Sequence, residues 1–180
     1  MKKSILFIPT FLAIFAIIIS PSISFAQPYG KGLYDANVPY GNQTSLSIST
    51  SGNITIPITP TTDGTLATGS STVTVSSTDV VGYKLYIRAL NTTNMDNLGT
   101  PLPTSANGSP APLSVDTWGY NTDASTNFVG IGLTDTLIHS VSSPIKNDAT
   151  TVTYGMNLDF AKPAGNYSAT VIYTAVPQTT

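Results

Sequence analysis

The chain has 180 residues, of which only 9% are charged, with nine Asp, no Glu, no Cys and a single His. This composition excludes zinc sites built from Cys and His, thiol nucleophiles, Glu-based acid–base pairs and a disulfide framework, because the residues that they need are missing. The sequence also contains no cluster of basic residues that could contact several phosphates, so nucleic acid is not an expected partner.

The first 26 residues have the pattern of a secretory signal peptide. Lys2 and Lys3 precede an apolar run from Ile5 to Ile19, and Ser24-Phe25-Ala26 places small residues at the two positions that a signal peptidase recognises. The run is shorter than the ~20 residues that a membrane-spanning helix needs, and no second run of that length follows it. We therefore predict cleavage after Ala26 and a secreted, extracellular protein of the cell surface with no membrane span in its mature form.

Residues 27–44 are predicted to form an extended arm in front of the folded domain. The segment is rich in Tyr, Gly and Pro, which is typical of chain outside regular structure.

From Ser45 onward, apolar side chains recur at every second position, the pattern of strands with one buried face. This alternation predicts strands at 45–50, 54–59, 71–77 and 81–89, with a turn at Thr62-Asp63-Gly64 between the second and the third. The fourth is predicted to bury Tyr83, Leu85, Ile87 and Ala89 and to leave the intervening side chains half solvated.

The second half of the domain begins with a long irregular connection, 91–112, which contains four Pro. A short strand at 117–120 is then expected to point Trp118 inward. The segments 127–133 and 136–141 are ambiguous, whereas the alternation over 152–160 and 167–176 predicts two further strands.

These elements indicate an all-β domain over residues 45–180. No window outside the signal peptide has helical periodicity, and seven to nine short strands separated by turns predict an Ig-like, Greek-key antiparallel β-sandwich. A closed barrel is the main alternative, but the long Pro-rich connection favours a Greek-key crossover over a simple meander.

Four segments carry a resemblance to known proteins: SLSISTSGNITIPITP, STVTVSSTDVVGYKLYI, TWGY and YGMNLDFAKPAGNYSATVIYTAVP. Their succession is similar to small secreted β-sandwich surface proteins of candidate-phylum bacteria, a group of unassigned role. The closing piece, PAGNYSATVIY, also resembles the last strands of fimbrial and spore-coat-type subunits. That resemblance implies an Ig-like fold used for surface filaments or adhesion, although a shared fold alone does not fix a function.

Few residues offer catalytic or metal-binding chemistry. His139 would have to meet a Ser and an Asp to form a hydrolase site, and its neighbours lack the glycines of a nucleophile elbow. Asn121, Asp123, Ser125 and Asn127 have the alternate spacing of a calcium loop but lack its Gly and closing Glu, so a hydrogen-bonded polar turn is the default interpretation. We predict no catalytic residue, no metal site and no cofactor.

Two other features have a functional alternative to a structural role. Trp118 and Tyr120 lie two apart on one side of a strand and could stack on sugar rings, but a lone Trp in such a domain is more often part of the core. Lys84 or Lys162 could form an isopeptide bond to an Asn with the help of Asp159, whereas an ordinary surface lysine is the simpler interpretation.

The sequence therefore predicts a secreted, non-enzymatic structural subunit or adhesin that assembles with itself or with other surface proteins through β-edge or donor-strand contacts. The alternative is a module that binds carbohydrate or a host surface through exposed aromatic side chains.

Overall fold

The computed structural model describes residues 45–78 and 81–178, and the regular structure in them is entirely β. The nine strands are β1 (Ser45–Thr50), β2 (Thr65–Thr78), β3 (Gly82–Ala89), β4 (Met95–Asn97), β5 (Thr100–Leu102), β6 (Thr117–Asn121), β7 (Thr136–Val141), β8 (Ile145–Leu158) and β9 (Val171–Gln178). No helix occurs in these residues, and hence none that is long and apolar enough to cross a membrane. The predicted signal peptide and arm lie outside the described residues.

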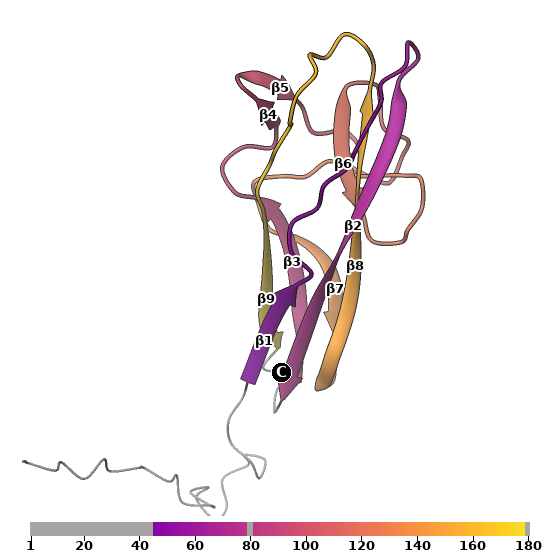
Figure 1. Cartoon of the computed structure of the whole chain (residues 1–180). Helices are drawn as coiled ribbons and strands as arrows, with labels where there is room; N and C mark the ends of the chain where they lie inside the picture. Colours follow the sequence, from indigo (N-terminus) through magenta and orange to yellow (C-terminus); the bar gives the residue numbers. More distant parts are fainter. Residues whose placement is uncertain (1–44, 79–80, 179–180) are drawn as a thin grey trace, which may run out of the picture.

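Two antiparallel sheets pack face to face and form the predicted β-sandwich (Figure 1). One sheet has the strand order β1-β2-β8-β6 and the other has the order β7-β3-β9, while β4 and β5 form a separate short hairpin. The chain crosses between the sheets from β2 to β3, from β3 through the β4–β5 hairpin to β6, and again from β6 to β7, β7 to β8 and β8 to β9. This connectivity agrees with the predicted Greek-key organisation rather than with a meander.

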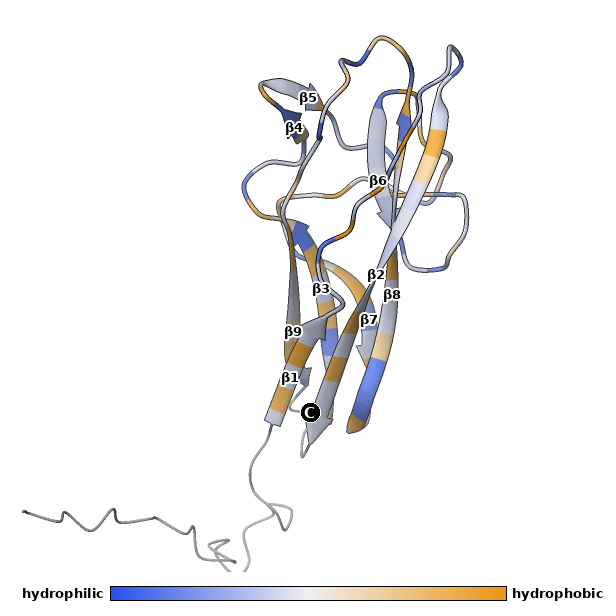
Figure 2. Ribbon diagram, in the orientation of Figure 1, coloured by the Kyte–Doolittle hydropathy of each residue, from blue (hydrophilic) through white to orange (hydrophobic). Residues whose placement is uncertain are grey.

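The core lies between the two sheets, where the period-two alternation places apolar side chains from both inner faces. Bands of hydrophobic residues alternate with polar ones along the strands in Figure 2, and the start of β8 is hydrophilic. Among the residues with no exposed surface are Val73, Val75, Tyr83, Leu85, Ile87, Ala89, Trp118 and Val152. The inward faces predicted for 71–77 and 81–89, and the inward Trp118, are therefore confirmed.

The edges of the two sheets differ in how they are covered. The outer edge of β6 is occupied by loop backbone. The Trp118 amide donates to the Pro103 carbonyl and the Trp118 carbonyl accepts from the Ser105 amide, while the backbones of Tyr120 and Val129 exchange two hydrogen bonds. β7 is short and its pairing with β3 is interrupted by a shift in register. β1 and β9 are also edge strands, and they approach each other without a ladder between them in the described part of the chain.

The largest difference from the prediction is the segment 51–60. Alternate exposure of its side chains is present, with Ile54, Ile56 and Ile58 half-buried, but the segment is not part of a sheet. Gly52, at φ +103°, ends the run after β1, and the Ser51 amide donates to the Thr72 carbonyl beside it. Alternation therefore predicted an extended chain correctly and a hydrogen-bonded strand wrongly.

The bounds of the strands in the last third of the domain also differ from the predicted ones. β8 begins at Ile145, well before the predicted start at residue 152, and it ends at Leu158, so that Phe160 is 69% exposed. β9 begins at Val171 rather than at residue 167. The ambiguous segment 136–141 is β7 with the expected bounds, and the turn at 62–64 is present.

Candidate functional site

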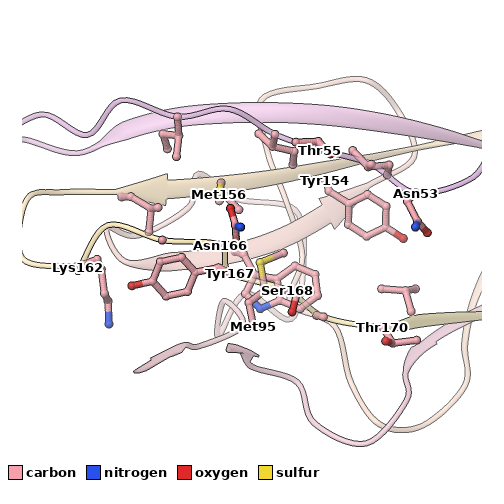
Figure 3. A pocket seen from close by; sticks show the side chains of 18 of the residues that line it. Asn53, Thr55, Met95, Tyr154, Met156, Lys162, Asn166, Tyr167, Ser168 and Thr170 are labelled. Atoms are coloured by element: carbon pink, nitrogen blue, oxygen red, sulfur yellow. The ribbon is translucent and has the colours of Figure 1, made fainter. Parts of the chain in front are cut away.

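An open groove of about 1250 Å³ runs along one side of the sandwich (Figure 3). The segment 50–60 forms its first wall, the segment 162–173 forms its second wall, and side chains of β6 and β8 lie at its floor. In Figure 3, Tyr154 lies between the two walls, with Asn53 and Thr55 on one side and Ser168 and Thr170 on the other.

The first wall packs against β2 at Gly69, which has no side chain. A Cβ atom added at Gly69 would lie 2.7 Å from Cγ2 of Ile54 and 2.8 Å from Cγ1 of Ile56, so both isoleucines occupy the space that a side chain at this position would need. Pro57 and Pro60 lack backbone N–H groups, which reduces the number of donors with which this segment could join a sheet. The wall is therefore held mainly by apolar packing.

The second wall is tied to β4 through its backbone. The Asp96 amide donates to the Ser168 carbonyl at 3.0 Å, and the Ser168 amide donates back to the Asp96 carbonyl at 3.1 Å. The Tyr167 hydroxyl donates to the Pro163 carbonyl at 3.0 Å within the wall itself. These bonds hold the wall apart from the segment 50–60 and so keep the groove open.

The aromatic and apolar side chains beneath the groove belong to the core, since Trp118 is fully buried and Tyr154 is 6% exposed. The Trp118 indole stacks on the Tyr154 ring with 6.4 Å between centroids, and its Nε1–H donates to the Thr93 carbonyl at 3.0 Å. The Tyr154 and Tyr173 hydroxyls share a hydrogen bond of 2.5 Å, which joins β8 to β9 across the sandwich. Burial raises the pKa of Tyr154, and the neighbouring Tyr173 raises it further, so both hydroxyls stay neutral at physiological pH.

Nothing in the groove resembles reactive machinery. Its one charged lining side chain is Lys162, whose Nζ donates to the Pro101 carbonyl at 3.2 Å. A groove between two walls of extended chain, with half-buried isoleucines on one wall, is suited to the non-covalent binding of an extended partner.

A second cluster of polar side chains lies between the start of β8 and the three-stranded sheet. The Tyr83 hydroxyl donates to Asp148 Oδ2 at 2.6 Å, and His139 Nε2 lies 2.9 Å from the same oxygen. Burial alone would raise the pKa of Asp148, but the hydrogen bonds from Tyr83 and His139, together with the charge of the imidazole, lower it on balance. Burial of Tyr83, together with its hydrogen bond to the Asp148 carboxylate and the charge of that group, raises the pKa of the Tyr83 hydroxyl.

His139 thus has the acidic partner that a hydrolase would use, but the third member of the cluster is Tyr83 and not a serine. No hydrogen bond joins the imidazole to a serine in residues 45–78 and 81–178. The cluster connects β3, β7 and β8 by hydrogen bonds, which is a structural arrangement.

The proposed calcium spacing at 121–127 forms a closed polar turn. Asn121 Nδ2 donates to the carbonyls of Ser125 and Asn127 at 2.9 and 3.0 Å, and the Ser125 amide donates to Asp123 Oδ1 at 3.1 Å. The hydrogen bonds from Ser125 lower the pKa of Asp123, because they favour its carboxylate form. The segment is thus a hydrogen-bonded polar turn, in which Asn121 Oδ1 is buried without a hydrogen-bond partner.

The other candidate residues are not brought into sites either. Trp118 has no exposed surface and Tyr120 is 4% exposed, so neither ring is accessible for stacking on a sugar. Lys84 is exposed on β3, and Asp159 accepts a hydrogen bond from the Ala161 amide, whereas Lys162 contacts a backbone carbonyl.

Sequence reasoning missed both the groove and the cluster around Asp148. The groove depends on where the segments 50–60 and 162–173 separate, which alternation does not report. The cluster joins residues whose strands pair only in the fold, although the alternation did place Tyr83 on the inner face of its strand.

A comparison with models of known protein families found no match, and a comparison with characterised proteins found no significant similarity. The interpretation of the groove therefore rests on its geometry.

Proposed function

We propose that the protein is a secreted, non-enzymatic structural subunit or adhesin of the cell surface that assembles through the edges of its sheets. The observation that carries the proposal is the edge of β9, with which no strand of residues 45–78 and 81–178 pairs, beside a groove of mixed polar and apolar lining. An edge strand with free backbone groups is a template for an added strand, and the groove provides space for the side chains of that strand.

The charges of the edge strands support the same function. Sheet edges that must stay monomeric usually carry Lys, inward charges or bulges. Neither β1 nor β9 contains a charged residue, whereas the edge strand β7 has an irregular register. The sequence pattern of a signal peptide supports an extracellular location, where such contacts could join subunits.

The experiment is a measurement of mass against concentration for the exported chain, residues 27–180, by light scattering coupled to size-exclusion chromatography. We expect species larger than the monomer whose share rises with concentration, and fibres or ordered oligomers by negative-stain electron microscopy. A monomer at every concentration up to the millimolar range would refute the proposal.

A further inference from the structure

We propose that residues 34–40 of a second copy of this chain occupy the groove as an extended strand along the segment 167–173, which leads into β9. This inference rests on the proposed function and adds to it the identity of the partner and the segment that binds. It is carried by the shape of the groove, by the pattern of the segment and by the length of chain between that segment and β1.

The groove presents the two features that an added strand requires. β9 pairs with β3 on one side, and no strand of the described residues pairs with its other side. Beside that free side, the inward chains of Tyr167, Ala169 and Val171 pack against the core and face the isoleucines of the segment 50–60 across the groove. A strand placed here would gain main-chain hydrogen bonds from the segment 167–173, which leads into β9, and apolar contacts from the half-buried side chains of the two walls.

The segment 34–40 has the complementary pattern. Tyr34, Ala36, Val38 and Tyr40 stand at every second position, so that in an extended conformation all four side chains point to one face. Seven extended residues span about 24 Å, the length of a strand of ordinary size. Its single charged residue, Asp35, falls on the other face together with Asn37, so the face turned to the groove carries no charge.

The chain length favours a second copy over the molecule's own arm. Ser45 begins β1, and the groove begins only at the far end of that strand, at Thr50. A reversal with the shortest, two-residue turn would place Tyr40 opposite Ser47 and Tyr34 opposite Asn53. The molecule's own segment would therefore run mostly beside β1 and reach the groove only with its first residues, whereas the segment of another copy has no such restriction.

Disulfide trapping tests this inference directly, because the chain contains no cysteine. Exported chains that carry Val38→Cys and Ala169→Cys are mixed, with a tag on one of them, and oxidised under mild conditions. We expect a cross-linked heterodimer, and we expect several-fold less of it when Asn37→Cys, whose side chain would point out of the groove, replaces Val38→Cys. Circular dichroism and thermal unfolding establish that each variant is folded.

The outcomes separate the inference from the proposed function. Oligomers by light scattering without a Val38–Ala169 cross-link would overturn the inference and leave edge assembly in place. A cross-link within a single chain of the double variant, and none between the mixed single variants, would also overturn it, because the molecule's own arm would then fill the groove. A monomer at all concentrations would refute both.

Discussion

Gly69 is the residue of β2 against which Ile54 and Ile56, in the first wall of the groove, pack. Replacement by Ala would place a Cβ within 2.8 Å of Ile54 and Ile56, whose branched side chains have little rotamer freedom to move away. Overpacking of this kind costs about 1–3 kcal/mol, which exceeds the ~0.4–1 kcal/mol that Ala gains over Gly by restricting the unfolded chain. We expect Gly69→Ala to lower the free energy of unfolding by about 1 kcal/mol or more in urea denaturation.

The neighbouring Thr68 provides the control for this prediction. Its side chain is exposed on the opposite face of β2, so Thr68→Ala should change stability by no more than about 0.5 kcal/mol. An unaltered stability in Gly69→Ala would show that the isoleucines do not hold the wall against β2.

Asp148 gives the domain a predictable dependence on acid. Its pKa is lower in the folded chain than in the unfolded chain, so the ionised carboxylate stabilises the fold at neutral pH. This contribution is lost as the pH falls below about 4, the ordinary pKa of Asp, toward the folded value. We expect Asp148→Asn to be less stable than the parent at pH 6 and to lose less stability than the parent between pH 6 and pH 3, as measured by urea unfolding.

Asp63 serves as the comparison for Asp148, since it is exposed in the turn before β2. Asp63→Asn should retain the parental loss of stability on acidification. If the two variants behave alike, the hydrogen bonds of Tyr83 and His139 do not bias the ionisation of Asp148.

The burial of a single residue was predictable where it depended only on the strand that contains the residue. Tyr83 and Leu85 were assigned to the core from alternation, and Trp118 because a lone Trp in such a domain is more often buried; all three are fully buried. The partners of Asp148 were not predictable, because His139 and Tyr83 reach it only after β3 has paired with β7 and the sheets have packed. Local pattern specifies which face a side chain takes, but not which residues it meets there.

At the scale of elements, β3 contributes most to the three-stranded sheet, because it pairs with β7 on one side and β9 on the other. Leu85 lies in its middle with no exposed surface, whereas Leu66 near the start of β2 is 42% exposed. The same substitution should therefore have different effects. We expect Leu85→Ala to cost about 2–5 kcal/mol, which is enough to unfold a marginal domain, and Leu66→Ala less than about 1 kcal/mol.

Chemical or thermal denaturation followed by circular dichroism measures this difference. If Leu85→Ala unfolds completely, Leu85→Met, which keeps the volume, should restore a cooperative transition. Equal stabilities of the two Ala variants would contradict the placement of the core between the sheets.

The errors in strand bounds have a common physical cause. Alternation reports that one face of an extended chain is covered, and this holds for the segment 51–60 even though it lacks a partner strand. Conversely, the first residues of β8 have no apolar period, yet Ile145 and Asp148 pair with β2 on either side of an irregularity at Lys146 and Asn147. The pairing of backbones leaves little trace in the sequence when the side chains over it are polar, and for this reason fold class was predictable and the edges of the fold were not.

At the scale of the whole molecule, the low charge and the exposed edges both affect whether copies of the protein associate. Few charges mean that electrostatic repulsion between copies is weak, and the net charge of the full sequence is only −2. An interface formed by the groove and backbone hydrogen bonds would also respond weakly to salt, because screening acts mainly on exposed charges. Association that falls steeply with added sodium chloride would indicate a different, charged interface.

A charge placed on β9 tests whether this edge is the one that assembles. Thr174 lies in the middle of β9, whereas Thr74 lies in β2, where it pairs with Ser49 of β1 on one side and with Ala149 of β8 on the other. Because a lysine on an edge strand opposes the addition of another strand, Thr174→Lys should shift the midpoint of association to at least several-fold higher concentration in light scattering. Thr74→Lys makes the same change in net charge on a strand that is paired on both sides, and its association should match that of the parent. An equal shift in both variants would mean that net charge, and not the edge of β9, controls assembly.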